Sequence, residues 1–124
     1  MKNKTQFIPR LFNVNPKICI YDKDGTIVDS SHRAKYNEDG TLDLEHWKLN
    51  KTKENIFQDT LLPLYWQLRA DYEQGNIIVL CTADELNKYD LEFIHSMGIY
   101  YDYLYSRPKG NPTIDEILKN AQLR

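Results

Sequence analysis

Two short apolar runs, with helix-forming sequence between them, constrain the fold of this chain most strongly. Residues 17–21 (KICIY) and 76–82 (NIIVLCT) have the length and apolar character of strands buried inside a sheet. Residues 100–106 (YYDYLYS) form a third, weaker candidate. Strands that alternate with helices favour a parallel sheet with right-handed crossovers. We therefore predict an α/β fold of three layers, a Rossmann-like parallel sheet with helices on both faces.

Helical periodicity describes most of the remaining sequence. Residues 54–73 carry apolar side chains at helical spacing, and Pro63 is expected to split this segment into two helices. Residues 85–97 and 113–123 show the same spacing. The polar segment 30–53 fits neither period, so we expect a flap or small hairpin there, which forms a minimal cap over one end of the sheet.

Length and charge bound the class of protein. A chain of 124 residues fits a single domain, residues 1–124, with one modest core. A net charge of -2 argues against a broad nucleic-acid surface but not against a local basic pocket. Cys19 and Cys81 lie inside apolar runs, which predicts buried free thiols. With no apolar run of membrane-spanning length and no apolar signal core, we expect a cytoplasmic protein without membrane contacts.

An acidic cluster follows the first predicted strand directly. Residues 22–29 (DKDGTIVD) place Asp22 and Asp24 at the carboxyl end of that strand, where open α/β sheets bind ligands. Such a pair suits one nucleophile and one general acid–base, and it offers the oxygen ligands that Mg²⁺ prefers. Gly25 lets the backbone bend sharply, and we expect Gly25 and Thr26 to contribute to substrate binding. A solvated acidic turn is the alternative for an isolated Asp-x-Asp.

The segment DKDGTIVD resembles the first motif of the haloacid dehalogenase-like (HAD) superfamily of phosphatases and phosphotransferases. The resemblance implies that Asp22 attacks phosphorus to form an aspartyl-phosphate, and that Asp24 protonates the leaving group and then activates water. The run IIVLCT is similar to the second motif of the family, which implies that the Thr82 hydroxyl binds a phosphoryl oxygen. Mg²⁺ is the implied cofactor, with Asp22 and Asp24 as its ligands.

The third motif of that family is a lysine that neutralises charge beside the nucleophile, and this chain has two candidates. Lys109 follows the third predicted strand, and Lys119 lies four residues after Asp115 in the last predicted helix. The pattern RPxG followed by DxxxK resembles the phosphatase domain of phage polynucleotide kinase-phosphatases, in which the helix lysine is functional. Because residues at i and i+4 share a helix face, we favour Lys119, oriented by Asp115, over a plain surface ion pair.

The same resemblance supplies a candidate for substrate binding. Arg33 stands where the subgroup carries an arginine for the substrate phosphate, and a guanidinium group suits bidentate phosphate binding. The position of a second subgroup arginine is occupied by Asp84, which departs from the pattern. The implied substrate is a phosphorylated small molecule such as a nucleotide, or a nucleic-acid end such as a 3′-phosphate.

The resemblance covers residues 17–119 and stops before the fourth motif, an acidic pair that supplies a further Mg²⁺ ligand. Only five residues follow Lys119. Three explanations remain open: a split or C-terminally truncated gene product, a partner chain or second copy that completes the sheet, or weak metal binding. We predict a Mg²⁺-dependent phosphomonoester hydrolase, with a catalytically impaired binding or assembly module as the alternative.

Overall fold

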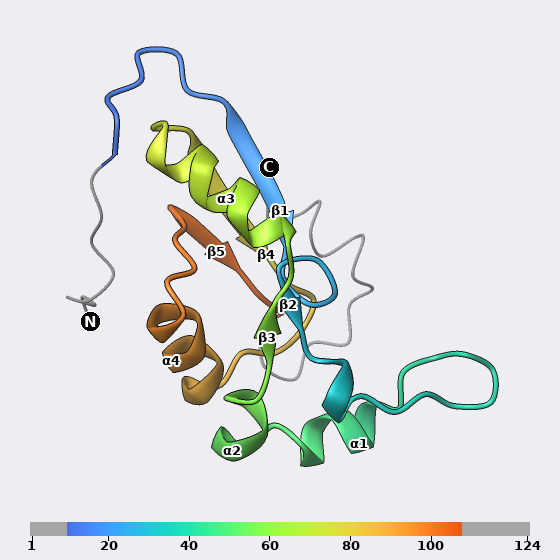
Figure 1. Ribbon diagram of the computed structural model, residues 1–124. Helices are drawn as coiled ribbons and strands as arrows, with labels where there is room; N and C mark the ends of the chain where they lie inside the picture. Colours follow the sequence, from blue (N-terminus) through green and yellow to red (C-terminus); the bar gives the residue numbers. More distant parts are fainter. Residues whose placement is uncertain (1–9, 108–124) are drawn as a thin grey trace.

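The computed structural model describes residues 10–107, and the structural statements below concern this part of the chain. It is a mixed α/β fold with a parallel three-stranded sheet and a separate two-stranded sheet (Figure 1). The elements in chain order are β1 (Ile18–Asp22), β2 (Val28–Asp29), the 3₁₀ helix η2 (Ser31–Arg33), α1 (Leu44–Leu49), α2 (Lys53–Ile56), β3 (Thr60–Leu61), α3 (Leu64–Glu73), β4 (Ile77–Cys81), α4 (Lys88–Ser96) and β5 (Tyr103–Tyr105). None of these helices is long and apolar enough to cross a membrane.

The main sheet has the strand order β1-β4-β5, with all strands parallel. This arrangement confirms the strands predicted over 17–21 and 76–82, and it confirms a shorter strand within 100–106. Ile18 pairs with Ile77 at one end of the sheet, and Asp22 pairs with Cys81 at the other. Because β1 and β4 end at the same level, the residues that follow them emerge side by side.

One face of this sheet carries the core. Both crossovers, through α3 and through α4, advance in the same direction along the sheet, and right-handed connections then place both helices on one face. The core cluster consists of Tyr21, Ile27, Val28, Ile56, Tyr65, Leu68, Ile78, Leu80, Phe93, Ile94 and Ile99. On the opposite face, the side chains of Ile18 and Ile20 are 66% and 55% exposed. The predicted layer of helices on both faces is therefore seen on one face, and the helix predicted over 113–123 lies outside the described residues.

The segment before α3 is not helical as predicted. Residues 57–62 include the short strand β3, which pairs antiparallel with β2 through Val28 and Leu61. Pro63 is the N-terminal cap of α3, and the residue before a proline disfavours helical geometry. The chain is therefore extended just before Pro63. Of the predicted split helix, only the residues in α2 and those in α3 are helical.

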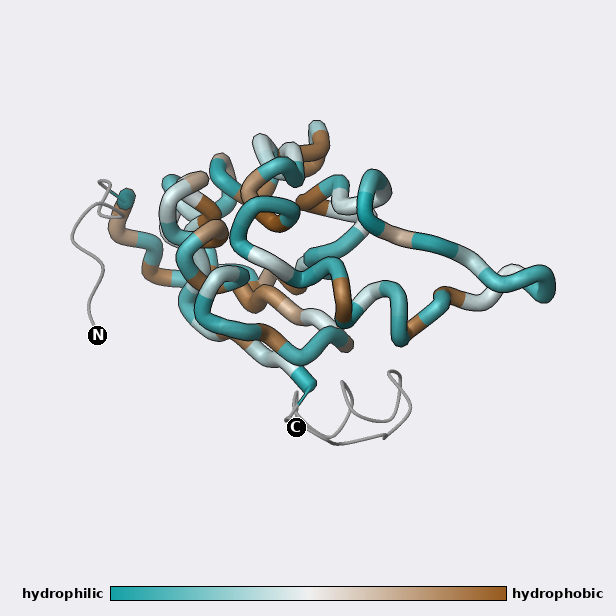
Figure 2. The backbone as a smooth tube through the Cα atoms, turned by 90° about the horizontal axis from the view of Figure 1, so that it is seen from below, coloured by the Kyte–Doolittle hydropathy of each residue, from teal (hydrophilic) through white to brown (hydrophobic). Residues whose placement is uncertain are grey.

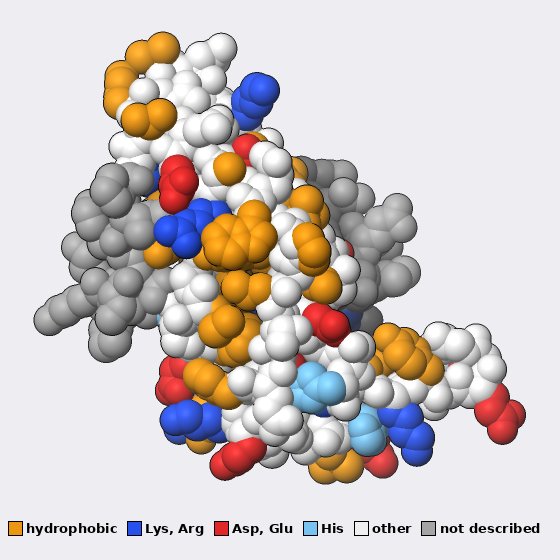
Figure 3. All heavy atoms as spheres, viewed as in Figure 1, with side chains coloured by type: hydrophobic (Ala, Val, Ile, Leu, Met, Phe, Trp, Pro, Cys, Tyr) orange, Lys and Arg blue, Asp and Glu red, His pale blue; other side chains and the backbone are white. Residues whose placement is uncertain are grey.

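The cap, residues 30–53, contains the expected hairpin and an unexpected helix. A single bridge between Tyr36 and Leu42 closes the hairpin, which protrudes from the body of the molecule (Figure 1). The cap then continues into α1, where the Asp43 side chain accepts a hydrogen bond from the His46 amide and caps the helix. Figure 2 shows the hydrophilic end of the hairpin, and Figure 3 shows hydrophobic side chains gathered instead over α3.

The segment that leads into β1 lies close against the turn after α3. The Leu11 amide donates to the Glu73 carbonyl oxygen at 2.8 Å. Gly75 adopts a positive φ of 82°, and a β-carbon at this position would lie 2.3 Å from the Leu11 carbonyl oxygen. Glycine is therefore required at position 75 for two reasons, its backbone conformation and the space available.

Replacement of Gly75 by alanine tests this close approach. Gly75→Ala should lower the free energy of unfolding by about 2–4 kcal/mol, because left-handed strain adds to a steric clash. Gly98→Ala is the matched control, since Gly98 has a φ of 70° but its nearest neighbours would lie 3.5 Å away. We expect about 1–2 kcal/mol for that control in urea denaturation. Equal losses in the two variants would contradict the clash with Leu11.

Candidate active site at the carboxyl end of the sheet

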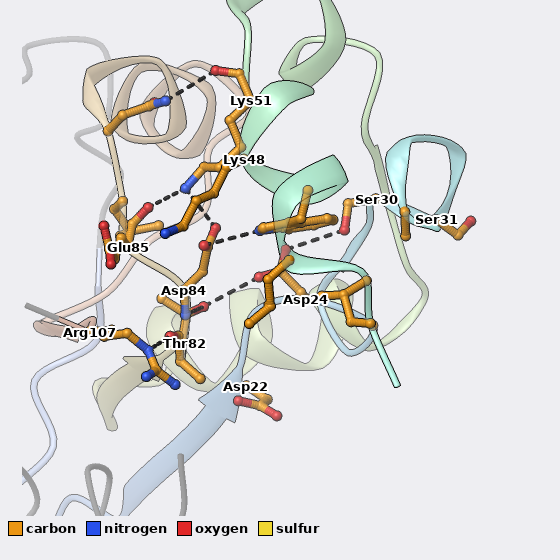
Figure 4. A pocket seen from close by; sticks show the side chains of 18 of the residues that line it. Asp22, Asp24, Ser30, Ser31, Lys48, Lys51, Thr82, Asp84, Glu85 and Arg107 are labelled. Carbon is orange, nitrogen blue, oxygen red and sulfur yellow. Dashed lines mark hydrogen bonds and ion pairs between the residues drawn. The ribbon is translucent and has the colours of Figure 1, made fainter. Parts of the chain in front are cut away.

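A cavity of about 1110 Å³ opens where β1 and β4 end (Figure 4). It is lined by Asp22, the last residue of β1, by Asp24 and Gly25 in the turn after it, and by Thr82 directly after β4. Residues of the cap and of the loop before α4 form the other walls. The structure therefore brings together four of the predicted site residues, and it does so at the predicted edge of the sheet. Thr26 does not line the cavity.

The turn after β1 is held by backbone hydrogen bonds. The Lys23 carbonyl oxygen accepts from the amides of Thr26, Ile27 and Val28 at 2.9–3.3 Å, and the Gly25 amide donates to the Val28 carbonyl oxygen at 2.8 Å. Gly25 has a φ of 78°, the conformation for which glycine is suited. The Gly25 amide is therefore hydrogen-bonded within the turn. The carboxylates of Asp22 and Asp24 lie at the cavity.

Asp24 is the residue on which polar contacts of the site converge. Its Oδ2 accepts a hydrogen bond from Thr82 Oγ1 at 3.3 Å, and its Oδ1 accepts from Ser30 Oγ at 3.4 Å. The Lys23 ammonium group lies 2.9 Å from Oδ1, although the Lys23 side chain is only 1% exposed. A buried ammonium group requires such a partner. No side-chain role was predicted for Lys23 or Ser30, and their position beside the acidic motif was the only indication in the sequence.

Asp84 joins the cap to Thr82 at the end of β4. Its carboxylate accepts from Trp47 Nε1 at 3.1 Å and from Lys51 Nζ at 2.9 Å, and its amide donates to Thr82 Oγ1 at 3.1 Å. Lys51 also lies 3.1 Å from the fully buried carboxylate of Asp90. The acid at the position where an arginine was expected is therefore neutralised by a lysine from the cap, and it locks α1 against the loop after β4 (Figure 4).

Arg33 lies away from the cavity. Its side chain is 1% exposed, and its Nε and Nη2 bind the two carboxylate oxygens of Asp59 at 3.0 and 2.8 Å. The guanidinium carbon also lies 4.3 Å from the centre of the Trp47 ring. The guanidinium group therefore holds the cap to Asp59, the residue directly before β3, and this placement does not match the predicted role in binding the substrate phosphate.

Arg107, the first residue of the RPxG pattern, is a cationic side chain of the cavity wall for which no role was predicted. It follows β5, lines the cavity, and donates from Nε to the Ala83 carbonyl oxygen at 2.6 Å. The candidate lysines Lys109 and Lys119, together with Asp115, lie outside the described residues.

Asp29 and Ser31 also line the cavity. A hydrogen bond from the Ser31 hydroxyl, reinforced by one from the Ser31 amide, holds the pKa of the Asp29 carboxyl below its usual value.

The donor set for a metal ion consists of carboxylate oxygens. Asp22 and Asp24 both line the cavity, and hard oxygen donors suit Mg²⁺, which commonly retains several waters. Within residues 10–107, no group of three or more His, Cys, Asp and Glu side chains is placed to hold a metal. The two aspartates supply oxygen donors of the kind that suits this ion.

Comparison with known proteins gives two matches. A family model described as Bacteriophage T5 5'-deoxynucleotidase matches residues 4–109, a range that includes Asp22, Asp24 and Thr82. The 5'-deoxynucleotidase of Escherichia phage T5 is 35% identical over 96 residues, which cover 74% of this chain and 39% of the relative. The chain thus spans about two fifths of the length of that relative. No solved structure matches the chain.

Substitution of Lys51 tests the link between the cap and the loop after β4. Lys51→Met should lower the free energy of unfolding by about 3–5 kcal/mol, because it leaves the buried carboxylate of Asp90 without its cation. Lys53→Met is the matched control: Lys53 is 59% exposed, lies 3.9 Å from Glu92, and should contribute less than about 0.5 kcal/mol. Chemical denaturation measures both. Similar small losses would show that Lys51 does not compensate these acids.

Proposed function

Because the chain belongs to the Bacteriophage T5 5'-deoxynucleotidase family, we propose that it hydrolyses the phosphomonoester of a nucleoside monophosphate. The observation that carries this proposal is that Asp22, Asp24 and Thr82 all line one cavity at the carboxyl end of a parallel sheet. Ligands of open α/β sheets bind at that edge. The similarity to a phage enzyme named for this activity supports the choice of substrate class.

The proposed chemistry follows the resemblance to the HAD superfamily. An Asp22 carboxylate oxygen attacks phosphorus while the bond to the nucleoside oxygen breaks, and Asp24 transfers its proton to that leaving oxygen. The products are an aspartyl-phosphate and the free nucleoside. Asp24 then accepts a proton from a water molecule, whose oxygen attacks phosphorus and releases inorganic phosphate from Asp22. Both carboxylates line the cavity, as these two steps require.

Positive charge and hydrogen-bond donors are needed where the phosphoryl group is transferred, since most catalysis of this reaction is electrostatic. In this proposal the Thr82 hydroxyl, which donates to Asp24 in the structure, turns to bind a phosphoryl oxygen. Arg107 brings a guanidinium group to the same cavity. Lys119, oriented by Asp115, and Lys109 remain the candidates for the additional lysine that the resemblance implies.

Mg²⁺ is proposed as the cofactor, held by Asp22 and Asp24 and by water. When bound, it neutralises the negative charge that otherwise keeps an anionic phosphate from an anionic nucleophile. The chain's own residues position the two carboxylates through the turn after β1 and its hydrogen bonds.

A mononucleotide is favoured over a polynucleotide 3′-phosphate end. The polynucleotide interpretation was based on the RPxG and DxxxK pattern, most of which lies outside the described residues, and on Arg33, whose guanidinium group is bound to Asp59 in the interior. It was also weakened by Asp84, which the structure shows bound to Lys51 and Trp47. At both positions where the subgroup carries an arginine, the side chain of this chain is bonded to other residues of the protein.

Asp22→Asn tests the nucleophile. We expect phosphate release from deoxynucleoside 5′-monophosphates in Mg²⁺ to fall by about 10³-fold or more, because an amide cannot form the acyl-phosphate. Glu54→Gln, an exposed carboxylate on α2 outside the cavity, should retain the activity of the unmodified protein. Removal of divalent ions with EDTA should abolish the activity, and Mg²⁺ should restore it. Full activity of Asp22→Asn would refute the covalent mechanism.

Paired substitutions of Thr82 test its role at the phosphoryl group. Thr82→Val removes the hydroxyl with little change in volume and should lower kcat by about 10²-fold, since it removes one donor to the transferring group. Thr82→Ser keeps the donor and should retain most of kcat. Steady-state kinetics with one deoxynucleoside 5′-monophosphate gives both values. A serine variant as slow as the valine variant would mean that the hydroxyl is not the functional feature.

A further inference from the structure

The hairpin of the cap presents an apolar face to the cavity. Tyr36 and Leu42 are directly opposite each other in an antiparallel bridge, flanked by hydrogen bonds from Asn37 to Thr41 at 2.7 Å and from Asp43 to Lys35 at 2.8 Å. Residues opposite each other in such a bridge place their side chains on the same face. Leu44 follows Leu42 by two residues through the extended Asp43, which aligns the two leucines.

Tyr36, Leu42 and Leu44, called here the apolar rim, all line the same cavity as Asp22, Asp24 and Thr82. The Tyr36 side chain is 63% exposed and the Leu44 side chain is 64% exposed. Burial of these exposed side chains by a ligand would make the free energy of binding more favourable, because it removes apolar surface from water. The cavity therefore has one charged end, formed by the carboxylates and Thr82, and one apolar end, formed by the rim.

The charges around the rim restrict what it can bind. Residues 36–44 contain Glu38, Asp39 and Asp43 and no lysine or arginine. The end of the hairpin is hydrophilic, as Figure 2 shows. Along this segment a phosphodiester chain or an anionic membrane would meet three carboxylates, with Lys35 as the adjoining cation before Tyr36. An uncharged, flat and largely apolar group attached to a phosphate fits both ends of the cavity, and a nucleobase is such a group.

We propose that the apolar rim is the nucleobase subsite of this protein, with Tyr36 as the residue on which the base stacks. This inference rests on the proposed hydrolysis of nucleoside monophosphates and assigns the recognition of the base to the cap. Asp84 and Lys51 position the subsite, because they join the helix after the rim to the loop that carries Thr82. Stacking of a base on an aromatic side chain contributes about 10- to 100-fold to affinity.

The test compares two substrates that differ only in the base. Deoxyadenosine 5′-monophosphate and 2-deoxyribose 5-phosphate share the phosphate and the sugar. The unmodified protein should prefer the nucleotide by about 10- to 100-fold in kcat/KM. Tyr36→Ala should remove most of this preference through KM and leave kcat/KM for the sugar phosphate within about twofold, while Tyr36→Phe should keep the preference.

Tyr103→Ala is the matched control, because Tyr103 is an exposed tyrosine (55%) on β5 that does not line the cavity. It should leave both substrates unchanged. The proposal is overturned if the unmodified protein does not distinguish the two substrates, or if Tyr36→Ala slows both equally. Circular dichroism and the thermal midpoint confirm that each variant is folded.

The failure of this proposal is separable from the failure of the proposed function. If neither substrate releases phosphate, hydrolysis is refuted, and the subsite is then judged by calorimetric titration of the two ligands. Tighter binding of the nucleotide that Tyr36→Ala abolishes would support the subsite. Equal affinity of the two ligands, or a preference that survives in Tyr36→Ala, would overturn it.

Discussion

The parallel pairing of β1 with β4 is the constraint on which the site depends. The register sets Asp22 opposite Cys81, and the Lys23 amide extends the pairing by donating to the Cys81 carbonyl oxygen at 3.0 Å. Asp24 and Thr82 therefore leave the sheet beside each other and come within hydrogen-bond distance. A slip by one residue would turn every side chain of β1 to the other face and separate the two carboxylates from Thr82.

The second organising feature is the set of buried charges beneath the cap. Lys51 compensates Asp84 and Asp90, while Arg33 compensates Asp59. Trp47 belongs to both groups, since its indole nitrogen donates to Asp84 and its ring packs on the Arg33 guanidinium group. These contacts fix the cap relative to the sheet, and they set the distance between the apolar rim and the carboxylates that a nucleotide would have to span.

Sequence patterns were most informative where local rules and tertiary structure agree. Strands β1 and β4 are five residues long and contain continuous apolar runs, a length and composition that favour a strand in a parallel sheet. The patterns failed where contacts with other parts of the chain determine the secondary structure. Residues 57–62 have helical spacing, yet two neighbours favour an extended strand. Pro63 disfavours helical geometry in the residue before it, and β2 offers backbone groups with which β3 pairs. The short helix α1 was missed because its six residues are too few for periodicity, although the Asp43 cap was readable in retrospect.

What the sequence by itself determined is the acidic pair after one apolar strand and the hydroxyl after another, because the carboxyl ends of parallel strands must meet at one edge. Only the tertiary structure decided the partners of the charged groups. Arg33 had the residue type and position of an exposed site residue, and Asp84 had the position without the expected residue type. Burial removed that choice, since a charge withdrawn from water must find a counter-charge in the interior, and Asp59 and Lys51 supply it. Those partners lie 26 and 33 residues away along the chain, beyond the range of any local pattern.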